Sequence, residues 1–148
     1  MRKINHFIGG QNQIGTSGRV HNVFDPSSGL VQAEVDLASL DEVNDVVTVA
    51  QEAALLWKES SLTQRTQIMF TFREILSARA NELAKIVSRE HGKVISDAFG
   101  EVARGIENVE FACGIGQHLK GEINEQVSAG IEVYSLRQPL GVVAGITP

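Results

Sequence analysis

The chain has 148 residues, about one domain's worth of sequence, and a formal net charge of −5 at pH 7. This charge argues against a general nucleic-acid or anionic-membrane surface, and no apolar run approaches the length of a membrane span. Hydrophobic residues make up 43% and charged residues 21%, as in an ordinary globular protein. Cys113 is the only cysteine, so no internal disulfide is possible, and the N-terminus lacks a signal-peptide pattern. A cytoplasmic location is expected.

The N-terminal residues have the pattern of a small antiparallel β-meander. Short β-prone runs at residues 4–8 and 20–24 are separated by a Gly-rich stretch. A strong turn signal at residues 25–29 precedes an alternating apolar and polar run at residues 30–35. Such alternation is typical of a half-buried strand, so we expect the meander to end there.

Three amphipathic helices are expected next. Capping-box spacing marks the first two N-termini, where Ser39 precedes Glu42 and Ser61 precedes Gln64 by three residues. The second helix is predicted to extend to Gly92, and the third from about residue 94 to 118. Each carries an apolar stripe that predicts a shared core. In the first helix the stripe comprises Val43, Val46, Val47, Ala50, Ala53, Ala54 and Trp57.

A short apolar run follows near the end of the sequence. Residues 142–146 are β-prone and bounded by Gly and Pro, the pattern of a strand covered on both faces. In α/β folds, ligands bind just past the C-terminal ends of such strands. Because this strand needs neighbours that the sequence does not contain, the chain is expected to be the opening piece of a larger enzyme.

Few residues have the arrangement of a catalytic or metal site. The four histidines have no metal-ligand spacing to one another, to the cysteine or to carboxylates. Cys113 continues the apolar stripe of its helix, which favours a small core residue over a nucleophile. Neither a nucleophile elbow nor a Gly-rich phosphate loop is present. The sequence therefore predicts no catalytic residue and no metal site within the chain.

Arg104 is the strongest candidate for ligand binding. It lies on the polar face of the third helix, between Gly100 and Gly105. Glycine inside a helix costs about 1 kcal/mol relative to alanine, and Gly100 would clear the surface beside the guanidinium. Two interpretations stay open. Either Arg104 forms a weak pair with Glu101 on a solvated face, or its guanidinium binds a carboxylate.

Two long segments carry a resemblance to a known family. Residues 100–114 and 134–148 closely resemble methylmalonate-semialdehyde dehydrogenases, the coenzyme-A-acylating branch of the aldehyde dehydrogenase superfamily. Three shorter segments, residues 7–10, 25–29 and 90–93, are similar to motifs generic to the superfamily. The resemblance covers essentially the whole chain.

The resemblance implies a fold and an assembly. It implies an aldehyde dehydrogenase-like α/β fold, of which residues 1–148 are the N-terminal part of the NAD-binding domain. A small antiparallel β-meander and three amphipathic helices would lead through strands into a Rossmann-like sheet. Residues 131–138 would belong to the oligomerisation strands, and the parent enzyme would be a homodimer or homotetramer.

The resemblance also implies a reaction and a division of roles. Malonate or methylmalonate semialdehyde would be oxidised with NAD and decarboxylated, and acetyl- or propionyl-coenzyme A would be released. Arg104 matches the family's substrate-carboxylate arginine. Ile146, Thr147 and Pro148 match a segment whose backbone lines the NAD site. Cys113 does not match the family's nucleophile, so the chain alone is expected to be inactive.

Two alternatives remain at this stage. The chain could be a non-catalytic helical module for binding or assembly, or part of another aldehyde dehydrogenase, such as one acting on succinate semialdehyde. A module would rarely end on a buried strand with an exposed edge, which argues against the first. The Gly-flanked segment around Arg104 argues against the second.

Overall fold

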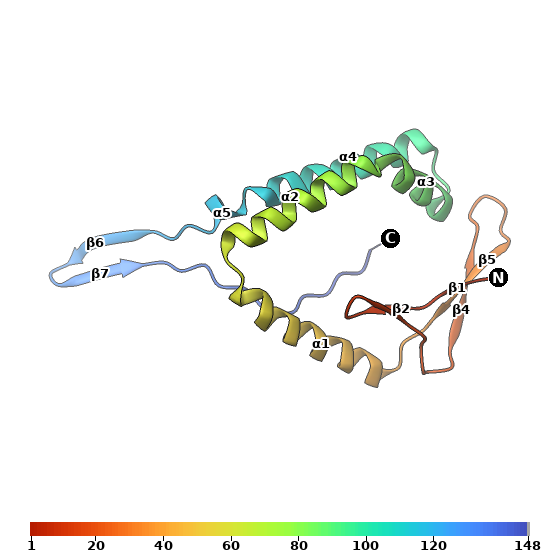
Figure 1. Ribbon diagram of the computed structural model, residues 1–148, viewed down its shortest axis with the longest axis horizontal. Helices are drawn as coiled ribbons and strands as arrows, with labels where there is room; N and C mark the ends of the chain where they lie inside the picture. The colour runs from red at the N-terminus through yellow and green to blue at the C-terminus, as the bar shows by residue number, and fades with distance from the viewer. Residues whose placement is uncertain (148) are drawn as a thin grey trace.

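The computed structural model describes residues 1–147, which fold into an open frame (Figure 1). Small sheets stand at one end, helices form the two sides, and a hairpin projects from the other end. The strands are β1 (Arg2–Ile4), β2 (His6–Ile8), β3 (Gln11–Gln13), β4 (Val20–Phe24), β5 (Val31–Asp36), β6 (Ile123–Ser128) and β7 (Ile131–Tyr134). The helices are α1 (Leu40–Glu59), α2 (Leu62–Ala78), α3 (Ala80–His91), α4 (Ile95–Cys113) and α5 (Ile115–His118).

The N-terminal strands form a mixed sheet and a separate hairpin. β5 is the central strand of the sheet. It pairs antiparallel with β4 and parallel with β1, where Arg2 stands opposite Ala33. β2 and β3 pair only with each other, through a turn at residues 9–10. The expected antiparallel meander is therefore wrong for residues 4–8, which divide between β1 and β2. A parallel pair needs a long crossover, here residues 5–30, and local alternation does not reveal such a partner.

Capping boxes open α1 and α2, as predicted. The Ser39 hydroxyl accepts from the backbone N–H of Glu42, and the Glu42 carboxylate accepts from the backbone N–H of Ser39. Ser61 and Gln64 repeat this arrangement at the start of α2. These reciprocal bonds satisfy donors that a helix N-terminus otherwise leaves unpaired.

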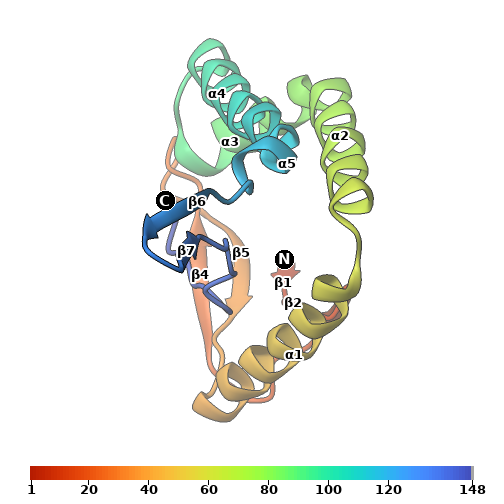
Figure 2. The same cartoon turned by 90° about the vertical axis from the view of Figure 1, so that its left-hand side faces the viewer.

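The second expected helix is divided at Arg79 into α2 and α3, which corrects the prediction of one helix up to Gly92. Gly92 itself closes α3 in the left-handed conformation, at φ +86°. An unbroken helix of about 30 residues would run about 45 Å from end to end. The bend lets both α2 and α3 pack against α4 (Figure 2). The third expected helix is likewise interrupted, at Gly114, between α4 and α5.

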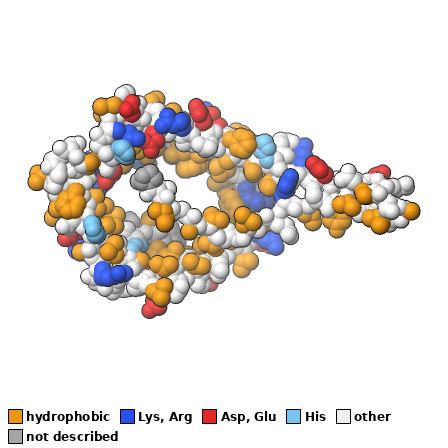
Figure 3. Space-filling model, turned by 180° about the vertical axis from the view of Figure 1, so that it is seen from behind, with side chains coloured by type: hydrophobic (Ala, Val, Ile, Leu, Met, Phe, Trp, Pro, Cys, Tyr) orange, Lys and Arg blue, Asp and Glu red, His pale blue; other side chains and the backbone are white. Residues whose placement is uncertain are grey.

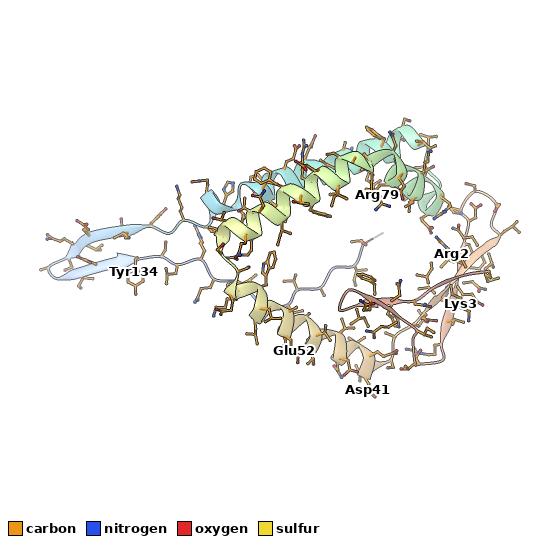
Figure 4. All side chains as sticks on the ribbon, viewed as in Figure 1. Arg2, Lys3, Asp41, Glu52, Arg79 and Tyr134 are labelled. Atoms are coloured by element: carbon orange, nitrogen blue, oxygen red, sulfur yellow. The ribbon has the colours of Figure 1, made fainter. Side chains whose placement is uncertain are left out.

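Two contacts join the sheet to α3 and close the frame. Nη2 of Arg2 lies 2.8 Å from Oε1 of Glu90, near the end of α3. Figure 4 shows Arg2 at this junction. Beside it, Gly92 packs against Pro26, since a Cβ at Gly92 would lie 3.1 Å from the proline Cγ. The end of α3 is therefore held by the turn that precedes β5.

The apolar run at residues 142–146 does not form the expected strand. Residues 139–147 are irregular, cross the interior of the frame (Figure 1) and have no ladder partner among residues 1–147. Ile146 is fully exposed, and Val143 is 77% exposed. A strand needs neighbours that satisfy its backbone N–H and C=O groups, and the described residues supply none. The apolar pattern of residues 142–146 is that of a strand, but these residues do not form one because no neighbouring strand is present among residues 1–147.

Very few side chains of the frame are buried. All of them are small, namely Ala33, Ala80, Ala84, Ala98 and Cys113. The surface area is 11,677 Å², whereas a folded monomer of 16.0 kDa exposes about 7,400 Å². α1 has no buried residue, and Figure 3 shows apolar side chains around the opening of the frame. Within the described residues, the helical stripes therefore do not share the single core that the sequence predicts.

Candidate functional site

The arginine that the sequence singles out lies in the middle of α4. Arg104 is exposed, and its guanidinium reaches back over Gly100. A Cβ built at Gly100 would lie 3.8 Å from Nη1 of Arg104, which is ordinary van der Waals contact. An alanine at position 100 would therefore fit beside the guanidinium, so the structure does not require a glycine there for clearance. A Cβ at Gly105 would meet only open space among the described residues.

The carboxylate nearest to Arg104 along the helix is engaged elsewhere. Glu101 precedes Arg104 by three residues, but its ion pair is with Lys93, in the turn between α3 and α4. The hydrogen bond and charge of Lys93 lower the pKa of Glu101, and the charges of His91 and Arg104 add smaller effects. In the described part of the chain, Glu101 and Arg104 form no ion pair. The interpretation of Arg104 as half of such a pair is therefore not supported.

The Arg104 guanidinium has no ion-pair partner anywhere among residues 1–147. Asn108 donates from Nδ2 to the backbone carbonyl of Arg104 at 2.8 Å, and this bond does not involve the side chain. A guanidinium presents its donors in a planar fork that matches a carboxylate. The exposed face of α4 can therefore bind an external anion without first breaking an internal pair.

The residues expected to line a cofactor site lie on the irregular segment inside the frame. Ile146 and Thr147 are exposed, and a Cβ at Gly145 would meet nothing within 4 Å. Pro148 lies outside the described residues. No hydrogen bond joins Arg104 to Ile146 or Thr147 in the part of the chain that the structure describes. Arg104 and the described residues of the expected cofactor wall are thus all exposed.

Cys113 is buried at the end of α4, as its place on the apolar stripe predicts. It borders a cavity of about 330 Å³ that Phe70, Arg73 and Glu110 also line. Nε of Arg73 donates to Glu110 Oε1 at 2.8 Å, so the nearby cation is already paired with a carboxylate. A reactive cysteine needs an environment that favours its thiolate and gives access to a substrate. This environment is that of a core cysteine.

Metal-site and membrane features are absent from residues 1–147. No group of three or more His, Cys, Asp or Glu side chains is arranged to hold a metal ion. No helix in this range combines the length and apolarity needed to cross a membrane.

Sequence reasoning missed two contacts made by glutamate side chains. Lys93 pairs with Glu101, and the backbone N–H of Thr16 donates to Glu42 Oε1 at 2.6 Å. Together with the backbone N–H of Ser39, this donor lowers the pKa of Glu42 to about 2. The sequence contains a weak indication of the Lys93 contact, because Gly92 ends α3 and so places Lys93 close to the start of α4. It contains none of the Thr16 contact, because its partners are 26 residues apart.

Comparisons with known proteins identify the family and the fold of the chain. The aldehyde dehydrogenase family matches residues 14–148. Malonate-semialdehyde dehydrogenase 2 of Geobacillus thermodenitrificans is 43% identical over 147 residues, which are 99% of this chain and 30% of that protein. A methylmalonate-semialdehyde dehydrogenase of Sinorhizobium meliloti, solved with NAD, is 44% identical with a TM-score of 0.92. The similarity covers 100% of this chain and 30% of that structure.

A second solved structure, a methylmalonate-semialdehyde dehydrogenase of Oceanimonas doudoroffii, is 41% identical with a TM-score of 0.88. It matches 95% of this chain, which covers 28% of that structure. The chain thus spans about 30% of the length of the relatives that it matches. Within that span its fold is the N-terminal portion of theirs. The family match extends over nearly all of the sequence, and the chain therefore belongs to the aldehyde dehydrogenase family.

Proposed function

We propose that residues 1–148 form the N-terminal part of an NAD-dependent, coenzyme-A-acylating dehydrogenase for malonate or methylmalonate semialdehyde. Its products would be acetyl- or propionyl-coenzyme A, CO₂ and NADH. The names of the relatives at 43% and 44% identity support this substrate class. The observation that carries the proposal is the exposed guanidinium of Arg104, which has no carboxylate partner among the described residues.

Arg104 is the residue to which we assign the substrate carboxylate. Both semialdehydes carry a carboxylate at one end and the reacting aldehyde at the other. A planar fork of N–H donors holds such a carboxylate through two parallel hydrogen bonds and so orients the whole molecule. The role of Arg104 is therefore binding and orientation, while the bond-making groups lie elsewhere.

We also assign one wall of the NAD site to residues 146–148. The backbone at Ile146 and Thr147 is accessible, and the open space at Gly145 suits close approach by a ligand. When bound, NAD would accept the hydride from the aldehyde carbon. The contribution of this chain would be a backbone surface that positions the cofactor.

The remaining machinery must come from other residues of the proposed enzyme. Cys113 is buried and is not placed as a nucleophile, so residues 1–148 alone should be inactive. The large exposed area also favours a partner surface: α1 and residues 142–145 line an apolar groove of about 470 Å³. Burial of such a groove stabilises association at roughly 25 cal/mol per Å² of apolar surface removed from water.

We propose that the β6–β7 hairpin, with residues 131–138, serves oligomerisation. Every residue of both strands is exposed, and the hairpin extends beyond the helices (Figure 1). Figure 4 places Tyr134 on this arm, far from the rest of the frame. Open strand edges readily pair with another chain. A homodimeric or homotetrameric enzyme and a cytoplasmic location both stay predictions.

The test is the substrate profile of the complete protein that contains this chain. NADH formation would be followed with malonate, methylmalonate and succinate semialdehydes and with propanal, in the presence and absence of coenzyme A. We expect turnover of the first two and release of a coenzyme A thioester. A preference for succinate semialdehyde, or release of a free carboxylic acid in place of the thioester when coenzyme A is present, would reject the assigned reaction. Absence of any turnover would favour a non-catalytic binding module.

A further inference from the structure

We propose that Lys93 is a positioning residue of the Arg104 site, which acts by holding the carboxylate of Glu101 away from the Arg104 guanidinium. The inference rests on the proposed role of Arg104 in binding the substrate carboxylate. It adds a second requirement to that role, namely that the competing carboxylate on the same helix face be occupied.

Glu101 is well placed to compete with a substrate carboxylate for the Arg104 guanidinium. Side chains three residues apart on a helix are neighbours, and an acidic residue N-terminal to a basic one is the favourable order. The chain contains a pair at this spacing at the start of α3, where Arg79 is the N-cap residue. Arg79 donates to Glu82, three residues later, through two bonds of 2.8 and 2.7 Å. Glu101 and Arg104 have the same spacing and the more favourable order, yet they form no ion pair in the described structure.

Lys93 accounts for the absence of an ion pair between Glu101 and Arg104. Its ammonium group forms the ion pair with Glu101, and the Lys93 side chain is only 23% exposed. The backbone of Lys93 is also fixed, since the Ser88 hydroxyl donates to its carbonyl at 2.7 Å. Gly92, just before it, is held against Pro26 in the left-handed conformation. Lys93 is therefore presented to Glu101 by the end of α3 and does not depend on a chance side-chain contact.

The charge of Glu101 decides whether the Arg104 guanidinium is free to bind a substrate. Glu101 is ionised at neutral pH, as an ordinary glutamate is, and the hydrogen bond and charge of Lys93 lower its pKa further. An ionised Glu101 that was released from Lys93 would be attracted to Arg104 and would repel an incoming carboxylate. With Lys93 in place, the negative charge is compensated, and the fork of Arg104 stays available.

The experiment compares Lys93→Met, Glu101→Gln and the double variant in the complete dehydrogenase. We expect Lys93→Met to raise KM for malonate semialdehyde about twofold, the weight of one helix-surface ion pair, with kcat unchanged. KM for propanal, which has no carboxylate, should not change. Adding Glu101→Gln to Lys93→Met should restore the original KM, because the competing charge is gone. Lys93→Arg should retain it.

A matched control is Lys85→Met, which removes an exposed lysine of α3 that has no ion pair in the described structure. It should leave both KM values unchanged. If the double variant keeps the raised KM, Lys93 acts by direct attraction of the substrate or by supporting the fold, and the proposal is overturned. An unchanged KM in Lys93→Met overturns it as well. Failure of the Arg104 role is separate, and it would appear as an unchanged semialdehyde KM in Arg104→Ala.

Discussion

Replacing Arg104 by alanine in the complete dehydrogenase should chiefly weaken binding of the semialdehyde substrate. The substitution should break no hydrogen bond or ion pair within the described part of the chain. Arg104 has no internal ion pair among the described residues, and the bond from Asn108 goes to its backbone carbonyl, which alanine retains. Helix α4 should therefore remain folded, and the loss of substrate affinity should result from the missing contact between Arg104 and the substrate.

The magnitude follows from the chemistry of that contact. A charge-assisted hydrogen bond contributes about 1.5–3 kcal/mol, which corresponds to roughly a 10- to 150-fold loss of binding. The carboxylate is remote from the reacting carbon, so the contact acts on ground and transition states alike. KM should therefore rise more than kcat falls. Arg104→Lys should recover only part of the loss, because an ammonium group lacks the planar fork.

The assay is steady-state NADH formation with methylmalonate semialdehyde and with propanal. Propanal has no carboxylate, so its kinetics should change little in Arg104→Ala. Arg79→Ala serves as a control, since it removes another exposed arginine, which lies between α2 and α3 and pairs with Glu82. Arg79→Ala should change kcat/KM by no more than a small factor for either aldehyde. Equal changes in kcat/KM for the two aldehydes in Arg104→Ala would remove Arg104 from the substrate site.

Further predictions concern the isolated chain and its folding. Residues 1–148 alone should produce no NADH from methylmalonate semialdehyde and coenzyme A; turnover above a heat-killed control would contradict this. Light scattering over a dilution series should reveal self-association, because apolar faces and strand edges are uncovered; a monomer at all concentrations would contradict it. Gly121→Ala should destroy the base of the β6–β7 hairpin, because the new Cβ would overlap the Ser135 carbonyl oxygen. Amide exchange should then rise there, whereas Gly105→Ala should leave it unchanged. The pKa of Glu42 is about 2 in the folded chain against an ordinary 4.5, so its contribution to stability is present above pH 4.5 and lost as the pH falls towards 2. Denaturant titrations should show a weaker acid dependence in Glu42→Gln, and an unchanged one would refute this assignment.

Several features could be read from the sequence because short-range interactions decide them. The capping boxes at Ser39 and Ser61 join residues three apart, and Gly92 ends α3 through its own backbone freedom. Helical periodicity placed Arg104 on a polar face and Cys113 on an apolar one. The family resemblance rested on contiguous segments. The roles of Arg104 and residues 146–148 stay predictions.

Tertiary structure alone decided which distant groups meet. The partner of β1 is a strand some thirty residues away, and the bend at Arg79 exists because α2 and α3 both pack on α4. The pairing of Glu101 with Lys93, and not with Arg104, depends on how the end of α3 is held by the turn before β5. Apolar periodicity predicts that a face will be covered, but it does not say by what. This is why the stripe of α1 and the run at residues 142–146 were recognised in the sequence yet remain uncovered within residues 1–147.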